Sequence, residues 1–360
     1  MKLAAEVRNA VTPRAALLVV GVLALQLLFI ASYVGALHDP KPKEVPFGVV
    51  APASVASQAA ARLADLPGDP LDPRVLADRE EARRQIMDRR IDGALVIDPG
   101  GTTDTLLVAS GGGTVLASAL HAITTELEAA QRRTVRTVDV APASPQDFDG
   151  LSAFYLVVGW CVGGYLLASI LAISAGSRPA NPQRAVIRLV VLALSALLGG
   201  LGGAIIVGPV LGALPGSVAA LWGLGTLVVF AVGAVTLALQ AVFGIVGIGL
   251  AVLLIVIAGN PSAGGAFPGP MLPDFWRAIG PALPPGAGTW AARSIAYFKG
   301  NALSGAMQVL AIWAVVGTVV TLVMSAVRKR AGRDDGAGHG VDDDADGAGH
   351  GDGPAGARPA

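Results

Sequence analysis

The stretch that decides the fold is Asn260–Lys299, which reads NPSAGGAFPGPMLPDFWRAIGPALPPGAGTWAARSIAYFK and lies between two long apolar runs. It is too rich in proline to be one continuous membrane helix, because each proline removes a backbone donor and interrupts helical geometry. Its aromatic rings are of the kind that prefer the headgroup level of a bilayer, namely Phe267, Phe275, Trp276, Trp290, Tyr297 and Phe298. We therefore predict an interfacial segment that leads into the final membrane helix.

The composition is typical of a polytopic α-helical membrane protein with one water-exposed insert. Of the 360 residues, 53% are hydrophobic and 14% are charged. The formal net charge is zero, and no Lys, Arg, Asp or Glu occurs from Leu189 to Met271, so a nucleic-acid partner is not expected. The single cysteine, Cys161, lies in an apolar run, which excludes an intramolecular disulfide and a cysteine-based metal cluster.

The apolar runs predict six transmembrane helices. The first run, Ala15–Ala36, is long enough to cross a hydrocarbon core of about 30 Å. A cleavable signal peptide is the alternative, since Val34-Gly35-Ala36 resembles a cleavage site, but the apolar core of a signal peptide is usually shorter. The later spans are Phe154–Ala175, Leu189–Leu211, two helices within Val218–Ala258 joined by a tight turn near Gln240, and Met307–Val327.

Residues 37–150, between helices 1 and 2, alternate strand and helix patterns and predict a small extracytoplasmic α/β domain. Asp78 and Glu81 have the spacing of a capping box at the start of a charged helix. Gly111-Gly112-Gly113 lacks the Lys of a phosphate-binding loop, so we interpret it as a flexible turn. The expected strands are Pro46–Val50, Pro73–Ala77, Gly93–Ile97, Thr105–Ala109 and Val135–Val140, and the expected helices are Ser54–Leu66, Glu80–Arg90 and Thr114–Arg133.

Basic residues near the ends of the spans predict the orientation. With six spans, the N-terminus, the loop 176–188 and the C-terminus fall on one side and carry the excess of Lys and Arg, so the positive-inside rule makes that side cytoplasmic. We therefore expect a multi-pass protein of the plasma (inner) membrane. Residues 1–36 form the N-terminus and helix 1, residues 151–330 hold helices 2–6, and residues 331–360 form a disordered acidic cytoplasmic tail.

The predicted spans contain no ionisable residue, which argues against transport driven by a proton gradient. The sequence has neither a nucleotide-binding motif nor a hydrolase motif. We therefore expect no catalytic, cofactor-binding or metal-binding residue and no enzyme activity, and any ATP would be bound by a partner subunit. Gly159 with Gly163, and Gly199 with Gly203, have the spacing of close helix contacts, either movable or static.

The stretch Asn260–Gly265, followed by Pro268, Leu272-Pro273, Phe275, Arg277 and Leu283-Pro284, resembles type 2 ABC exporter permeases. Within them it is most similar to the YhgE/Pip (phage infection protein-like) branch, in which an Asn-Pro-Ser-Ser/Ala-Gly-Gly signature precedes a Leu-Pro pair and an aromatic residue. The unit Asp78–Ile97 also resembles the insert of that branch, although this insert lacks a long coiled-coil region.

This resemblance implies a homodimer or heterodimer of permeases and a cytoplasmic ATPase subunit that grips the coupling loop 176–188. Arg178, Arg184 and Arg188 would then face the ATPase, unless their role is purely topological. The implied function is outward movement of a hydrophobic or amphipathic substrate. The alternative is a non-transporting cell-surface membrane protein whose α/β domain binds a ligand, a phage or an envelope component.

The extracellular segment 259–303 is the other candidate site. Thr289–Lys299 can form a short helix with Trp290, Tyr297 and Phe298 on one face. We expect it to act as a lid or re-entrant element that shapes the exit, or as an anchor at the membrane surface in contact with lipid. Its candidate residues are Asn260, Pro261, Gly264, Gly265, Pro268, Leu272, Pro273, Phe275, Arg277, Pro284, Trp290 and Phe298.

Overall fold

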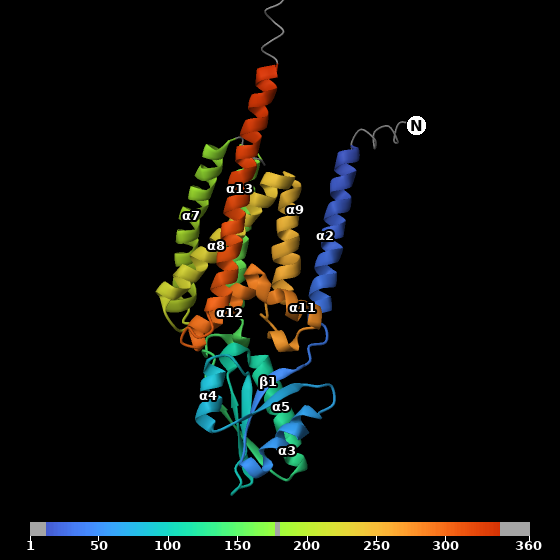
Figure 1. Cartoon of the computed structure of the whole chain (residues 1–360), viewed down its shortest axis with the longest axis vertical. Coiled ribbons are helices and arrows are strands. Elements are labelled where there is room, and N and C mark those ends of the chain that lie inside the picture. Colours follow the sequence, from blue (N-terminus) through green and yellow to red (C-terminus); the bar gives the residue numbers. More distant parts are fainter. Residues whose placement is uncertain (1–11, 177–180, 339–360) are drawn as a thin grey trace, which may run out of the picture.

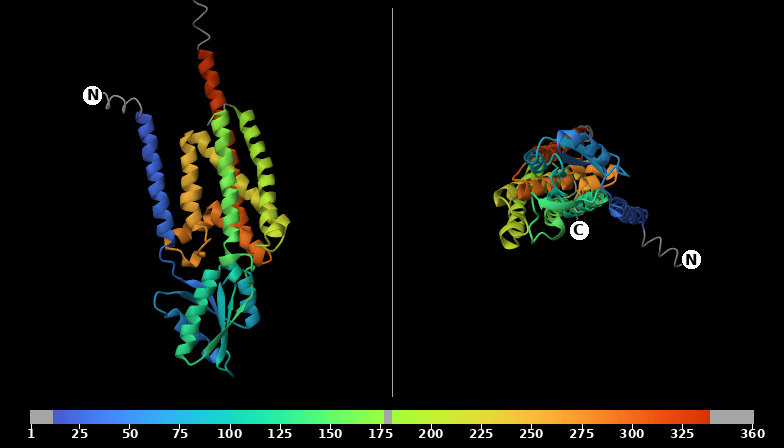
Figure 2. Two further views of the ribbon diagram at one scale, coloured as in Figure 1. Left: turned by 180° about the vertical axis from the view of Figure 1, so that it is seen from behind. Right: turned by 90° about the horizontal axis from the view of Figure 1, so that it is seen from below.

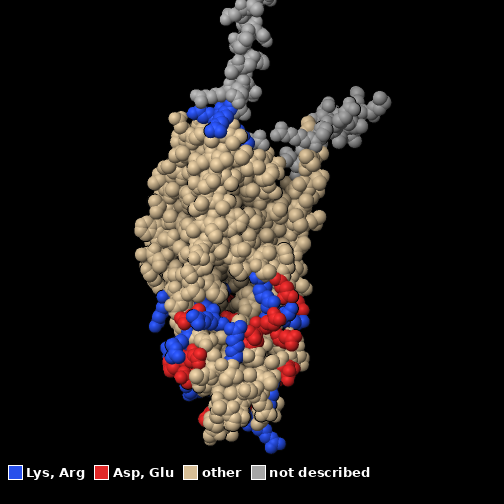
Figure 3. All heavy atoms as spheres, viewed as in Figure 1, with Lys and Arg blue, Asp and Glu red and all other residues tan. Residues whose placement is uncertain are grey.

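The computed structural model describes residues 12–176 and 181–338 and shows an elongated molecule with apolar helices at one end and an α/β domain at the other (Figure 1). Arg178, the first residues of the N-terminus and the end of the C-terminal tail lie outside the described residues. In the view of Figure 3, charged side chains gather on the α/β domain and reappear at the opposite end of the helices, and the surface between them is uncharged. This distribution is that of a membrane-embedded protein.

Within the described residues, five helices are long and apolar enough to cross a membrane. The sixth expected crossing is a shorter apolar stretch, Val246–Ser262, made of α9 (Val246–Val252), the π-helix η4 (Leu253–Gly259) and α10 (Asn260–Ser262). The long helices are α2 (Pro13–Leu37), α6 (Ser152–Ala175), α7 (Pro182–Ile205, extended by the π-helix η3, Ile206–Val210), α8 (Val218–Phe243) and α13 (Ser304–Gly338). α13 thus continues through residues 331–338, which composition alone places in a disordered tail.

Helix α8 is the centre of the helical bundle and contacts α6, α7 and α13. It ends at Phe243 because Gly244 adopts a φ of 65°, so the turn lies after Gln240, which is fully buried within the helix. Close packing on α8 uses Gly164 and Gly200, where an added Cβ would lie 2.6 Å from its backbone. By contrast, nothing lies within 4 Å of such a Cβ at Gly159, Gly163 or Gly199, so these glycines are not helix contacts within the chain.

Helix α2 lies beside the bundle rather than within it (Figure 2). Only 6% of its apolar window is buried, and it contacts η4 and α10. Its carboxyl end leads directly into the first strand of the α/β domain (Figure 1).

The α/β domain contains a five-stranded sheet in the order β2-β1-β3-β4-β5. β1, β2 and β3 are parallel, β4 is antiparallel to β3, and β5 is parallel to β4. One face is covered by α3 (Ala53–Ala64) and α5 (Thr114–Ala130), and the other by α4 (Arg79–Met87). The strands are β1 (Val45–Val50), β2 (Leu71–Leu76), β3 (Gly93–Val96), β4 (Thr103–Val108) and β5 (Thr134–Asp139), all within the predicted insert.

The helix cap at Asp78 is confirmed. Asp78 Oδ1 accepts a hydrogen bond from the N–H of Glu81 at 2.7 Å, and Glu81 Oε2 accepts one from the N–H of Ala77 at 2.8 Å. These bonds satisfy free donors at the start of α4 and fix where the helix begins.

Candidate functional site

The segment between α10 and α13 joins the helical bundle to the α/β domain (Figure 1). It folds into short turns and helices that begin at or next to prolines, since proline fits the first helical turn. They are the 3₁₀ turns η5 (Gly269–Met271) and η6 (Gly280–Ala282) and the helices α11 (Asp274–Ile279) and α12 (Pro284–Tyr297). α12 therefore begins at Pro284 rather than at Thr289.

The aromatic residues of α12 do not form a common face toward lipid. Phe298 is 2% exposed, and Tyr297 is also buried, so both rings contact protein. An added Cβ at Gly111 would lie 2.4 Å from Tyr297, one at Gly112 would lie 3.3 Å from Phe298, and Pro268 lies in the same way against Gly113. The triple glycine is therefore a turn, as expected, but one held in tight contact between the α/β domain and this segment rather than a flexible one.

Arg89, just after α4, extends this contact to Trp290. Its guanidinium lies 3.3 Å from the centre of the Trp290 ring and 4.7 Å from that of Phe298. Its Nη1 also donates to Trp290 O and to Ser294 Oγ, both at 2.8 Å. Burial lowers the pKa of Arg89 to about 9, so the guanidinium stays charged at neutral pH.

A second contact joins α11 to the chain just before β1. Lys43 Nζ lies 2.9 Å from Asp274 Oδ2, and the Lys43 N–H donates to Pro270 O at 3.0 Å. Arg277 donates to Lys43 O at 3.1 Å and to Glu44 Oε2 at 3.0 Å. Asp274 and Arg277 therefore hold α11 against the residues that lead into the α/β domain. Arg277, Lys43 and Asp274 form one ionic cluster.

Arg293 organises the glycines of the signature from inside the protein. It is 4% exposed, and it donates to Gly264 O at 2.7 Å, to Gly265 O at 2.8 Å and to Gly150 O at 3.2 Å. Gly264 needs its φ of 70°, and an added Cβ at Gly265 would lie 2.3 Å from Phe154. Burial lowers the pKa of Arg293 to about 10, and Asp147 and Tyr297 oppose that shift.

The remaining signature residues support this arrangement. Asn260, Pro261, Pro268, Leu272 and Pro284 are buried, whereas Pro273 is exposed at the start of α11. Phe275, at 63% exposed, is the candidate aromatic with the most free surface, compared with 40% for Trp290. The structure thus brings Gly265, Trp290 and Phe298 into contact with residues of the α/β domain or the start of α6, holds Gly264 on Arg293, and leaves Phe275 exposed.

The coupling loop is shorter than expected, because α7 begins at Pro182 and is capped by Asn181 Oδ1. Arg184 is exposed on the first turn of α7. Arg188 is 5% exposed and donates to Gly176 O at 2.7 Å, so it closes the loop from inside instead of facing a partner. Of these arginines, Arg184 is thus on the exposed surface of the chain and Arg188 is buried.

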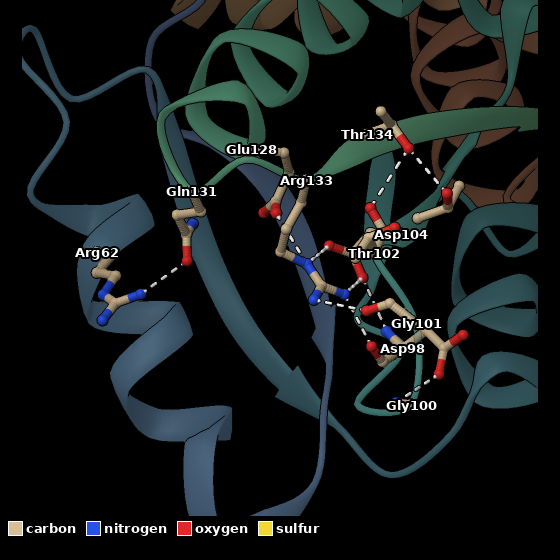
Figure 4. A network of polar contacts seen from close by, with 11 residues as sticks. Arg62, Asp98, Gly100, Gly101, Thr102, Asp104, Glu128, Gln131, Arg133 and Thr134 are labelled. Carbon is tan, nitrogen blue, oxygen red and sulfur yellow. Dashed lines mark hydrogen bonds and ion pairs between the residues drawn. The ribbon is translucent and has the colours of Figure 1, made fainter.

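A cavity of about 380 Å³ lies between α3, α5 and the end of β3, in the α/β domain, and sequence reasoning missed it. Its apolar wall includes Leu63, Leu95 and Leu127. A polar network closes one side, centred on Arg133, which donates to Asp104 Oδ1 and Oδ2, each at 2.6 Å (Figure 4). Its Nε also lies 3.5 Å from Glu128 Oε2.

Glu128 and Asp104 act as a coupled pair of buried carboxyl groups. Burial raises the pKa of Glu128 to about 7, and the hydrogen bond and charge of Asp104 raise it as well. Burial also opposes ionisation of Asp104, but its hydrogen bonds with Arg133 and the Asp98 N–H outweigh that effect and lower its pKa. Below about pH 7 the pair therefore carries one proton, and that proton is on Glu128. Two carboxyl groups from distant positions in the sequence gave no signal of this contact.

A second, apolar cavity of about 650 Å³ lies among α6, α7 and α8 at the level of the apolar helices. Gly159, Gly163 and Gly199 form part of its wall. Trp160 Nε1 donates to Gly199 O at 3.1 Å and borders the same cavity. Gly159, Gly163 and Gly199 thus open space for the cavity, whereas Gly203 is a close contact of α7 with α6, because an added Cβ there would lie 2.4 Å from Trp160 Nε1.

Within the described residues, no group of three or more His, Cys, Asp or Glu side chains has a geometry that could hold a metal ion. No protein-family model matches the chain, and no curated protein is significantly similar to it. The fold and these sites define a polytopic helical protein with a cavity-bearing α/β domain.

Proposed function

We propose that this protein is the membrane-spanning permease subunit of an ATP-driven exporter of the type 2 ABC class, close to the YhgE/Pip branch. It moves a hydrophobic or amphipathic substrate outward across the plasma membrane, with both termini in the cytoplasm. The observation that carries this proposal is the connection between the α/β domain and the segment that links α10 to α13. Arg89, Arg277 and Arg293 bridge the two parts. A displacement of the last helices would therefore be transmitted to the extracytoplasmic domain.

The apolar cavity among α6, α7 and α8 supports the choice of substrate class. Its wall is mostly apolar and includes Leu156, Trp160 and Val229. A substrate with a hydrophobic body can enter such a cavity from the lipid without exposing apolar surface to water. Bound in this way, a substrate would lie against the central helix α8.

An ATPase partner supplies the energy, since this chain has no nucleotide-binding motif. Arg184 is an exposed cation on the first turn of α7, at the end of the bundle opposite the α/β domain. A homodimer or heterodimer of permeases would present two such loops to a pair of ATPase subunits. Arg188 is excluded from this contact because it is buried.

Purification of the tagged full-length chain in mild detergent tests the proposal. We expect an ATPase subunit to co-purify with the wild type and with Lys329→Glu, but to be lost in Arg184→Glu. Lys329 is the matched control because it is an exposed cation at the same end of the molecule. Failure to recover any ATPase from the native host membrane, or equal recovery with Arg184→Glu, would contradict the proposal.

The cavity in the α/β domain favours a second candidate function, a surface protein that binds an extracellular ligand without transport. Filling the cavity by Ala59→Phe discriminates the two, because Ala59 lines it. If the protein is a surface protein that does not transport, Ala59→Phe loses ligand binding, and no ATPase co-purifies with either the wild type or the variant. In the exporter case the partner ATPase is retained.

A further inference from the structure

The cavity between α3 and α5 has the size and lining of a small-molecule site. Its volume of about 380 Å³ falls in the range of ligand-binding clefts, which are mostly apolar with a few convergent polar groups. The apolar wall comes from both helices and from β3, and the polar groups are gathered at the ends of those elements: Gln58, Arg62, Asp98, Glu128, Gln131 and Arg133.

The position of the cavity within the sheet also favours ligand binding. It lies beyond the carboxyl end of β3, where Ile97, Asp98 and Pro99 follow the strand. After β1 the chain passes through α3 to β2, which lies on one side of the β1–β3 pair, and after β3 it passes to β4, which lies on the other side. The strand order therefore reverses between β1 and β3. Ligands of open α/β sheets bind at such switch points, outside the carboxyl ends of the strands.

The two buried acidic groups at the cavity, Asp104 and Glu128, are already neutralised. Asp104, directly behind it, is paired with Arg133, and Asp98 Oδ1 accepts the Gly100 N–H at 2.9 Å (Figure 4). Glu128 is 3% exposed and keeps its proton below about pH 7. An amine would therefore have to compete with Arg133 for Asp104 or displace the proton of Glu128.

By contrast, the cavity has hydrogen-bond donors that stay available to a ligand. Arg62 extends from α3, and its Nη1 donates to Gln131 Oε1 at 3.0 Å, which leaves Gln131 Nε2 directed elsewhere (Figure 4). A guanidinium has five N–H groups, so most of those of Arg62 stay available to a ligand. Gln58, one turn before Arg62, adds a further amide to the same side.

From this arrangement we propose that the α3–α5 cavity binds a small amphipathic anion, with its apolar body on Leu63, Leu95 and Leu127 and its anionic head at Arg62 and Gln131. The single O–H of neutral Glu128 is directed to Asp104, so Glu128 favours the anionic head by staying uncharged beside it. The inference concerns the α/β domain and holds whether or not an ATPase partner is found.

Because Glu128 must be neutral, binding is proton-linked. The charged groups that face it are Asp104 on β4, Arg133 before β5, Arg62 on α3 and, through Arg133, Asp98 after β3. Ionisation of Glu128 at higher pH would place a carboxylate against the bound anion. Binding should therefore be tighter at pH 6 than at pH 8.

Octyl sulfonate is a suitable probe, because its charge is constant over this pH range. Binding to the full chain in lipid nanodiscs, corrected with empty nanodiscs, should be saturable and tighter than binding of octanol or octyltrimethylammonium. Arg62→Met should weaken it about tenfold by removing charged hydrogen bonds. Arg136→Met, an exposed arginine outside the cavity, should leave it unchanged. Glu128→Gln should retain binding and abolish its pH dependence.

Thermal unfolding of each variant separates loss of the site from loss of the fold. If Arg62→Met unfolds early, Ala59→Phe serves instead, because it fills the apolar part without removing a polar group. The absence of saturable binding would overturn the proposal. So would octyltrimethylammonium binding as tightly as octyl sulfonate, or equal effects of Arg62→Met and Arg136→Met.

Discussion

Arg89 is the residue that ties α4 to α12. It lies in the left-handed region at a φ of 56°, which turns its side chain away from α4 toward Trp290. Non-glycine residues rarely adopt such a conformation, and they do so where the surrounding contacts compensate the cost. Here the compensation is the stacked ring and the hydrogen bonds to Trp290 O and Ser294 Oγ.

Replacing this arginine should loosen the domain contact. Arg89→Met removes the cation and the fork of donors, and we expect a loss of about 2 kcal/mol in the free energy of unfolding. Arg83→Met, on the exposed face of α4, is the control and should be close to neutral. Thermal unfolding of the purified protein measures both. Equal unfolding midpoints for the two variants would show that the Arg89 contact contributes little to the free energy of unfolding.

Glu128 should make stability depend on pH. Its pKa is raised from 4.5 to about 7 in the folded protein, so the folded state holds a proton that the unfolded state releases. The stability contribution of the neutral form is fully present below about pH 4.5 and is lost as pH rises through about 7. Glu128→Gln should remove this slope and stabilise the protein at pH 8 by on the order of 2 kcal/mol.

A pH series of unfolding midpoints from pH 5 to pH 8 measures this slope. Glu126→Gln, which changes an exposed carboxyl on the same helix, should keep the wild-type slope. If Glu128→Gln also keeps the wild-type slope, the group whose protonation changes on unfolding is not Glu128.

At the residue scale, sequence patterns predicted local contacts and missed distant ones. The Asp78 cap was predictable because its donors lie within one turn. Arg293, Arg188 and the Asp104–Glu128–Arg133 network were not, because their partners come from other parts of the chain. A lone arginine among small and apolar residues is the signal in the sequence that could have pointed to Arg293.

At the scale of elements, the turns η5 and η6 show how the segment is built. Both have the sequence Gly-Pro-x and both are 3₁₀ turns, but their surroundings differ. An added Cβ at Gly280 would lie 2.0 Å from Ser262 O, whereas nothing lies within 4 Å of one at Gly269. Backbone therefore approaches backbone at η6, which holds α10 against α12.

This difference gives a matched pair of variants. Gly280→Ala should destabilise the protein by about 3 kcal/mol, because the Ser262 backbone must move to admit a methyl group. Gly269→Ala should have little effect. The yield of monodisperse protein after detergent extraction, together with the unfolding midpoint, measures the outcome. Equal yields for the two variants would mean that the backbone at η6 can shift to admit a methyl group at little cost.

The elements of the α/β domain were predictable because their hydrophobic periodicity is strong. The five strands lie within a few residues of the positions expected from sequence. The segment 260–303 was less predictable, because its prolines indicate where helices break but not what the pieces contact. Its aromatic residues were taken as membrane anchors on composition, whereas Tyr297 and Phe298 are covered by Gly111 and Gly112.

At the scale of the whole molecule, the charge distribution predicts which end faces which side of the membrane. Arg328, Lys329 and Arg330 lie at the far end of α13, and the α/β domain lies at the other end (Figure 3). The positive-inside rule places the basic end in the cytoplasm.

Single cysteines test this orientation in a Cys161→Ala background, which removes the native thiol. Arg74→Cys, exposed on β2, should react with an impermeant maleimide in intact cells. Lys329→Cys should react only after the membrane is permeabilised. The reverse pattern would invert the topology and with it the proposed direction of transport.

The sixth crossing expected from the sequence, formed by α9, η4 and α10, is shorter than the five apolar helices that are long enough to span a membrane. Its apolar stretch Val246–Ser262 is shorter than the helices that qualify as full spans, and it lies against α2. At about 1.5 Å per residue such a helix falls short of a hydrocarbon core of about 30 Å. A bilayer adapts to this hydrophobic mismatch by thinning locally, at a fraction of a kcal/mol per Å. We therefore expect lipids with short acyl chains to collect along this flank and to stabilise the protein more than long-chain lipids do.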